Sequence, residues 1–254
     1  MITMIKFTVE QRFIVTGASS GIGEGVALLL NELGATVIGI GRNQERLEGM
    51  RAKAKCPDTV FLEKKDLVED IAGLPAYVKA LKAKYGKFQG MAYCAGITAL
   101  SPARVFDLEY ARNVFDVNYF APLFMVKGMI DGRNNNGNGT SLVVISSVDA
   151  LLSVKGQSLY SGSKAGLSAS MRAIAHEVAA MGIRINCLLP SMIRTPMTLN
   201  SAANDLGLVE DGDERYPFGW GTPKDVAGFV AFLLSNSGQH LSGQNFVVDS
   251  GGIY

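Results

Sequence analysis

Short apolar runs alternate with longer helical stretches along the whole chain, and this alternation constrains the fold more than any other feature. Each run has the length of a strand and is bounded by glycine or polar turn residues. The predicted strands are Phe13–Val15, Thr36–Ile40, Val60–Leu62, Met91–Tyr93, Leu142–Ile145, Arg184–Leu189 and Phe246–Val248. The predicted helices are Ile22–Leu33, Gln44–Ala54, Ile71–Tyr85, Val105–Met129, Tyr160–Met181 and Lys224–Leu234. This order predicts an α/β, doubly wound fold: a mainly parallel seven-stranded sheet with helices on both faces.

Composition narrows the functional classes. Lys and Arg number 24 against 23 Asp and Glu, and this balance argues against a nucleic-acid partner. The 3 cysteines are far apart and show no disulfide framework, which favours a reducing cytoplasm. No apolar run reaches the roughly 18 residues of a membrane span, and the N-terminus is unlike a signal peptide. The 2 histidines, His176 and His240, have no companion ligands, so no metal site is predicted.

A glycine-rich segment, Thr16–Gly23, follows the first predicted strand and opens the first helix. Glycines let the backbone turn tightly and approach a pyrophosphate, whose charge is stabilised by the helix N-terminus. An ordinary strand-to-helix turn is the alternative, but the position at the first strand–helix junction favours dinucleotide binding. The residues predicted to bind the cofactor here are Gly17, Ser19, Ser20, Gly21, Ile22 and Gly23.

The end of the second predicted strand bears on the choice of cofactor. NAD sites usually place an acidic residue there to bind the adenosine ribose. This chain reads Ile40-Gly41-Arg42-Asn43, which offers no carboxylate. The Arg42 guanidinium could instead bind a 2′-phosphate, although it could also be a solvated residue at a helix start. The sequence therefore predicts NADP(H).

Tyr160 and Lys164 stand four residues apart in a predicted helix, so they share one helix face. An ammonium held beside a phenol favours the phenolate and lowers a pKa that starts near about 10. The phenol can then donate and accept a proton near neutral pH. The alternative is that Tyr160 packs in the structure while Lys164 extends past it to solvent.

Further motifs occur at the strand ends and in one helix. They are Asp66-Leu67, Tyr93-Cys94-Ala95-Gly96, Asn118, Ser147, and Pro190-Ser191 followed by Ile193 and Thr195. With the glycine loop and the Tyr160/Lys164 pair, they make the chain resemble the short-chain dehydrogenase/reductases from about Arg12 to Tyr254. Two positions depart from that family's pattern. Cys94 replaces an asparagine, and Ser191 replaces a glycine, where a Cβ atom would penalise a positive φ.

The resemblance implies a Rossmann fold and an oxidoreductase that uses NADP(H) to interconvert a ketone and a secondary alcohol. Tyr160 would be the acid/base and Ser147 would hold the substrate oxygen. Lys164 would contact the nicotinamide ribose, and Asn118 would hold a water that links Lys164 to solvent. The cofactor contacts implied beyond the glycine loop and Arg42 are Asp66, Leu67, Cys94, Ala95, Gly96, Tyr160, Lys164, Pro190, Ile193 and Thr195. Taken singly, Ser147 could cap a turn and Asn118 could satisfy a neighbouring backbone group.

We expect residues 1–254 to form a single dinucleotide-binding and catalytic domain, with 191–221 as a substrate loop. The expected partner is a small carbonyl or alcohol substrate. A 3-oxoacyl thioester reductase and a non-catalytic NADP-binding regulatory protein are the alternatives. The turn after the Tyr160 helix, Ala179–Gly182, lacks the arginine typical of carrier-protein reductases. Because the Val105–Met129 and Tyr160–Met181 helices are apolar on more than one face, we expect a homodimer or homotetramer.

Overall fold

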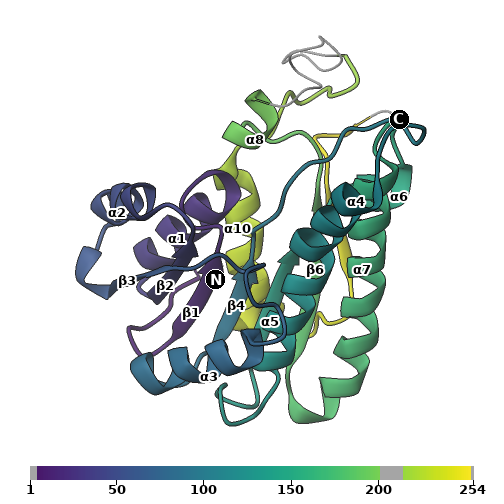
Figure 1. Ribbon diagram of the computed structural model, residues 1–254. Helices are drawn as coiled ribbons and strands as arrows, with labels where there is room; N and C mark the ends of the chain where they lie inside the picture. The colour runs from purple at the N-terminus through teal and green to yellow at the C-terminus, as the bar shows by residue number, and fades with distance from the viewer. Residues whose placement is uncertain (1–4, 201–213, 253–254) are drawn as a thin grey trace.

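The computed structural model describes residues 5–200 and 214–252, which contain one seven-stranded sheet (Figure 1). The strands are β1 Arg12–Thr16, β2 Thr36–Gly41, β3 Val60–Lys64, β4 Gly90–Tyr93, β5 Ser141–Ile145, β6 Arg184–Pro190 and β7 Asn245–Val248. Their spatial order is β3-β2-β1-β4-β5-β6-β7, and every neighbouring pair is parallel. The seven predicted strands are therefore confirmed, and the sheet is parallel throughout.

Helices follow most of the strands, as the alternating pattern predicts. The longer ones are α1 Gly21–Glu32, α2 Gln44–Lys53, α3 Leu74–Tyr85, α4 Leu108–Phe115, α5 Ala121–Met129, α7 Ser158–Val178 and α10 Pro223–Leu234. The short ones are α6 Asp149–Leu152, α8 Pro196–Leu199, η1 Pro57–Thr59, η2 Asp116–Phe120, η3 Ala179–Met181 and η4 Asn236–Gly238. No described helix is long and apolar enough to cross a membrane.

Two hydrophobic cores cover the two faces of the sheet. Successive side chains of a strand point to opposite faces, so Ile14 of β1 joins one core while Phe13 and Val15 join the other. The core around Ile14 includes residues of α3, α5 and α7, and the second core includes residues of α1, α2 and α10. Burial on both faces explains why the strands are almost continuously apolar.

The predicted helical stretch Val105–Met129 is helical from Leu108 to Met129, so it begins later than predicted and contains a π-helical turn. Residues before Leu108 are not helical, because the Asp107 side chain caps α4 by accepting a hydrogen bond from the Tyr110 N–H at 2.8 Å. The π-helical turn η2 then separates α4 from α5. Such turns interrupt helices most often at functional sites, and this one contains Asn118.

The expected substrate loop, 191–221, lies partly outside the described residues, because 201–213 are not among them. Its two described ends meet where Ile193 pairs with Gly221 in a parallel bridge. Between them, α8 begins at Pro196 and is capped by Thr195. The assignment of 1–254 to a single domain and the role of this loop stay predictions.

Candidate active site

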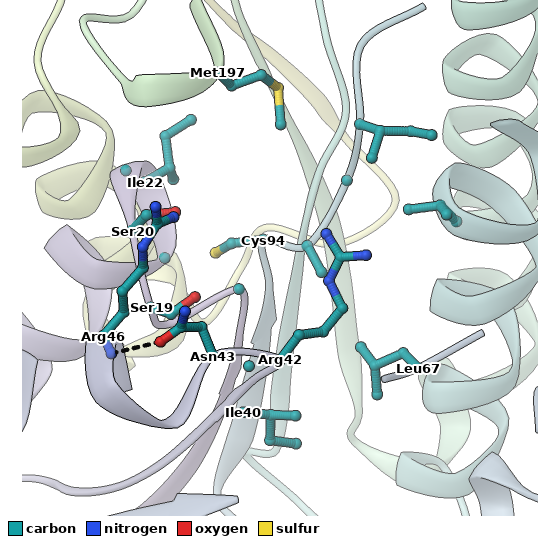
Figure 2. A pocket seen from close by; sticks show the side chains of 18 of the residues that line it. Ser19, Ser20, Ile22, Ile40, Arg42, Asn43, Arg46, Leu67, Cys94 and Met197 are labelled. Carbon is teal, nitrogen blue, oxygen red and sulfur yellow. Dashed lines mark hydrogen bonds between the residues drawn. The ribbon is translucent and has the colours of Figure 1, made fainter. Parts of the chain in front are cut away.

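A cavity of about 270 Å³ opens at the carboxyl ends of β1 and β4, where the strand order reverses (Figure 2). Ligands of doubly wound folds bind at this switch point. Thirteen of the residues predicted to bind a cofactor line the cavity: Gly17, Ser19, Ser20, Gly21, Ile22, Gly23, Arg42, Asp66, Leu67, Cys94, Ala95, Gly96 and Thr195. Tyr160, Lys164, Pro190 and Ile193 are not in its lining.

The glycine loop is packed too closely for side chains. Gly17 has a φ of +66°, and a Cβ there would lie 3.0 Å from the Ala95 nitrogen. A Cβ on Gly23 would overlap the Gly17 carbonyl oxygen. The Thr16 hydroxyl accepts hydrogen bonds from the Cys94 N–H at 3.0 Å and the Ala95 N–H at 3.1 Å, which fixes the loop against the end of β4. This bare backbone beside the α1 N-terminus fits a pyrophosphate.

Three basic residues surround the adenosine end of the cavity: Arg42, Arg46 and Lys65. The Arg42 side chain is 71% exposed, and its guanidinium lies 4.0 Å from the Asp66 carboxylate. Figure 2 shows the Arg42 and Arg46 side chains on separate sides of the cavity. Arg46 and Lys65 were not predicted; Arg46 lies in the first turn of α2, and Lys65 directly follows β3.

Lys164 is buried beneath the Tyr160 ring in α7. Its Nζ lies 5.8 Å from the ring centroid and donates a hydrogen bond to the Ile145 carbonyl at 3.0 Å. Burial lowers the pKa of Lys164 to about 8, although the charges of Cys187 and Cys94 oppose that shift. A Cβ on Gly96 would lie only 3.4 Å from Nζ, so the ammonium stands close behind the cavity wall.

Tyr160 has a higher pKa than the lysine pair predicts. Burial raises it to about 12, the Ser147 hydroxyl opposes this through a hydrogen bond, and the charge of Asp149 adds to it. Desolvation of the phenolate is the largest cause of this shift, and Lys164 is not among its causes; the Lys164 ammonium donates to the Ile145 carbonyl. That Lys164 lowers the Tyr160 pKa when the dinucleotide is bound stays a prediction.

Ser147 follows β5 and contacts an acidic residue that was not predicted. The Ser147 hydroxyl accepts a hydrogen bond from the Asp149 N–H at 3.2 Å and donates to Asp149 Oδ2 at 3.4 Å. Asp149 is half-buried, and burial raises its pKa. Its position two residues after Ser147 was the available sequence signal.

Asn118 is completely buried, and its side chain is bound to backbone. Its amide donates to the Ile97 carbonyl and accepts from the Ile97 N–H, both at 2.9 Å. It also donates to the Ser163 hydroxyl at 3.3 Å, and that hydroxyl donates to the Tyr160 carbonyl at 2.7 Å. The side chain of Asn118 thus ties the end of β4 to α7. Its role in holding a water stays a prediction.

The Pro190 loop closes the other side of the site. The Pro190 carbonyl accepts a hydrogen bond from the Val148 N–H at 3.1 Å. A Cβ on Gly21 would lie 3.1 Å from the Thr195 methyl carbon, so this loop packs on the glycine loop. Ser191 does not have a positive φ, so its Cβ carries no backbone penalty there.

Residues 17–252 match the sequence model of the family described as enoyl-(acyl carrier protein) reductase. The chain is 32% identical over 246 residues to the 3-oxoacyl-(acyl-carrier-protein) reductase FabG of Rickettsia prowazekii (strain Madrid E), covering 94% of this chain and 95% of that protein. The chain belongs to the short-chain dehydrogenase/reductase family. This short-chain dehydrogenase/reductase is an enzyme, an oxidoreductase with a Rossmann-type sheet.

Solved structures agree with the family and the fold. The short-chain dehydrogenase/reductase superposes on a dehydrogenase/reductase of Sinorhizobium meliloti 1021 with a TM-score of 0.86 and 25% identity, over 97% of this chain and 96% of that one. A short-chain dehydrogenase of Burkholderia cenocepacia J2315, solved in complex with NADP, gives a TM-score of 0.84 and 25% identity, over 95% and 97%.

Proposed function

We propose that this protein is an NADP(H)-dependent oxidoreductase that interconverts a ketone and a secondary alcohol, with Tyr160 as the acid/base. The observation that carries the proposal is the position of Lys164, whose Nζ lies 5.8 Å from the centroid of the Tyr160 ring. The Ser147 hydroxyl also acts on the Tyr160 hydroxyl and lowers its pKa. Ser147 follows the carboxyl end of β5, the strand beside β4. The dinucleotide cavity opens at this same edge of the sheet. The two hydroxyls can both bind one substrate oxygen, which is the arrangement that proton transfer to a carbonyl requires.

NADP(H) is the cofactor that suits the adenosine end of the cavity. Arg42, Arg46 and Lys65 line it, and a guanidinium forms its strongest hydrogen bonds with a phosphate. The acid in this part of the lining, Asp66, lies 4.0 Å from the Arg42 guanidinium. A ribose hydroxyl bound to Asp66 would therefore have a cation beside it, which suits a ribose that carries a phosphate. The Burkholderia relative solved with NADP supports the same cofactor.

When bound, NADPH supplies the hydride, and the protein controls position and charge. Ser147 would hold the carbonyl oxygen, and Tyr160 would protonate that oxygen as negative charge develops on it. Lys164 would bind the nicotinamide ribose and favour the Tyr160 phenolate after the proton is lost. Asn118 would hold the Ile97 backbone in place beside α7. It would also hold the water that returns a proton to Lys164.

Reduction of a 3-oxoacyl thioester is the second candidate, and the names of the FabG relatives favour it. Such a substrate is carried on an acidic protein and calls for basic groups near the entrance. The turn after α7, Ala179–Gly182, contains none. A free small ketone or alcohol therefore remains the first candidate.

A homodimer or homotetramer is the proposed assembly. Apolar side chains are exposed on and beside α4, η2 and α6: Val105, Leu108, Phe120, Leu151 and Leu152. A second copy of the chain would bury them.

Two variants separate proton transfer from cofactor binding. Tyr160→Phe removes the phenolic proton, so we expect turnover to fall by at least about 10²-fold while NADPH binding is retained.

Arg42→Ala removes a phosphate ligand, so we expect the KM for NADPH to rise about 10- to 100-fold with little change in the KM for NADH. NADPH absorbance with a ketone panel and NADPH fluorescence titration measure the two effects.

Contrary results would be clear in each case. Substantial ketone reduction by Tyr160→Phe would refute the role of the phenol. Equal effects of Arg42→Ala on NADPH and NADH would refute the assignment of the 2′-phosphate site.

A further inference from the structure

The carboxyl group of Asp149 stands beside the two hydroxyls that would bind the substrate oxygen. Its Oδ2 accepts from the Ser147 hydroxyl at 3.4 Å, and its charge acts on Tyr160. The proposed mechanism uses Ser147 and Tyr160 but gives Asp149 no part.

Most of the hydrogen-bonding capacity of Asp149 is unused. A carboxylate has about four acceptor sites. Within the described ranges, 5–200 and 214–252, the side chain has the one long bond to Ser147 and forms no ion pair. The Ser147 hydroxyl has a single proton to donate. When Ser147 donates it to a substrate oxygen, Asp149 loses its hydrogen bond from Ser147. A half-buried carboxyl then takes another donor, which is either water or a hydroxyl of the substrate.

The backbone holds this carboxyl in place. The Val148 N–H donates to the Pro190 carbonyl at 3.1 Å, and the Ala150 N–H donates to the Ser147 carbonyl at 3.0 Å. The Asp149 N–H itself donates to the Ser147 hydroxyl at 3.2 Å. The backbone on both sides of Asp149 is therefore hydrogen-bonded, which favours a fixed position for this residue beside Ser147.

We infer that Asp149 is a specificity residue that accepts a hydrogen bond from a hydroxyl group on the carbon next to the reacting carbonyl. The substrate class is then the α-hydroxyketones and the corresponding vicinal diols. This inference rests on the proposed function and narrows it.

A hydroxyl fits this position better than the alternatives do. It donates to the Asp149 carboxylate without bringing a charge of its own into a half-buried site, whereas an ammonium group would have to be desolvated there. A 3-oxoacyl thioester would bring a second carbonyl oxygen, which is an acceptor, against an acceptor, and this mismatch selects against it.

The test compares substrates of one carbon skeleton. Ketone reduction with NADPH is measured for 3-hydroxy-2-butanone, 2-butanone and the N-acetylcysteamine thioester of 3-oxobutanoic acid. We expect the native enzyme to prefer the hydroxyketone over 2-butanone by about 10- to 100-fold in kcat/KM, the effect of one hydrogen bond to a charged group. In Asp149→Ala, this ratio should fall toward one. In Asp149→Asn, which offers a donor, thioester reduction should rise relative to 2-butanone.

Ratios measured on one preparation cancel any loss of folded enzyme, and Asp58→Ala, an exposed aspartate of η1, is the matched control whose ratio should equal the native one. A native ratio near one, or an unchanged ratio in Asp149→Ala, would overturn the inference while ketone reduction itself upheld the proposed function.

A binding measurement covers the case in which no ketone is reduced, which would defeat the proposed function. Calorimetric titration of the NADPH-loaded Tyr160→Phe enzyme with 3-hydroxy-2-butanone and 2-butanone needs no turnover. The inference is supported if 3-hydroxy-2-butanone binds more tightly than 2-butanone and this difference disappears when Asp149→Ala is added. Equal binding of the two ketones to the Tyr160→Phe enzyme overturns it.

Discussion

Burial decides the protonation state of the Tyr160 hydroxyl. Burial raises its pKa to about 12, the Ser147 hydroxyl opposes the shift, and the Asp149 charge increases it. Lys164 lies under the ring, with its Nζ 5.8 Å from the centroid, and burial lowers its own pKa to about 8. The phenol is therefore the stable form at neutral pH, and the phenol is the form that ketone reduction requires.

This environment gives a pH prediction. Alcohol oxidation requires the phenolate, whose fraction grows with pH until the pH passes the pKa, so the rate of oxidation should rise between about pH 7 and about pH 10. Ketone reduction requires the phenol and should stay nearly level over the same range. Asp149→Asn removes a negative charge that opposes the phenolate, so it should shift the rise in oxidation to lower pH.

The measurement is kcat/KM for 2-butanol with NADP⁺ against pH at fixed ionic strength. This alcohol has no neighbouring hydroxyl, so the result does not depend on a bond to Asp149. A shift to higher pH in Asp149→Asn would contradict the prediction.

At the scale of the element, the π-helical turn η2 positions the site through Asn118. The turn ends α4 and brings a side chain inward that bonds to both backbone groups of Ile97 at 2.9 Å. Because η2 also reaches α7 through Ser163, three segments share one polar contact point. Buried polar networks of this kind are costly when only partly satisfied.

Removal of the Asn118 side chain should therefore destabilise the protein as well as slow it. Asn118→Ala leaves the N–H and carbonyl of Ile97 without their partners, so we expect the free energy of unfolding to fall by about 1–3 kcal/mol. Asn113→Ala, on the exposed side of α4, is the control and should change it by less than about 0.5 kcal/mol. Urea denaturation measures both. Equal stability of the two variants would show that Asn118 does not hold these segments together.

The elements were predictable to different degrees, for physical reasons. The inner strands are buried on both faces and are continuous apolar runs, and the more exposed edge strands β3 and β7 still carry short apolar runs, so all seven could be located from the sequence. Helices of four residues such as α6 have no periodicity to detect, and a π-turn inside an apolar stretch leaves the composition unchanged. The glycine loop was predictable because backbone approach demands glycine. Asp149 and Arg46 were not, because their importance depends on what the fold places beside them.

At the scale of the molecule, the apolar side chains exposed on and beside α4 form a surface that a second copy of the chain could bury. Leu108 is 64% exposed and Phe120 is 41% exposed. We predict a dimer or tetramer at micromolar concentration by light scattering. The double change of Leu108→Glu and Phe120→Glu should shift the mass toward the monomer, because burying charge at an interface is costly. Val9→Glu, at another exposed apolar residue, should not. A purely monomeric native protein would contradict the assembly.

The Thr16 hydroxyl has a consequence for biosynthesis. It bonds to the Cys94 N–H, 78 residues later in the chain, and the Thr195 methyl, which packs on Gly21, follows β6 in the sequence. During translation the glycine loop emerges early, but the walls that complete its cavity emerge much later. A nascent chain that stops before Thr195 would lack a complete cavity. Full stabilisation by the bound dinucleotide thus requires a chain whose synthesis has passed Thr195.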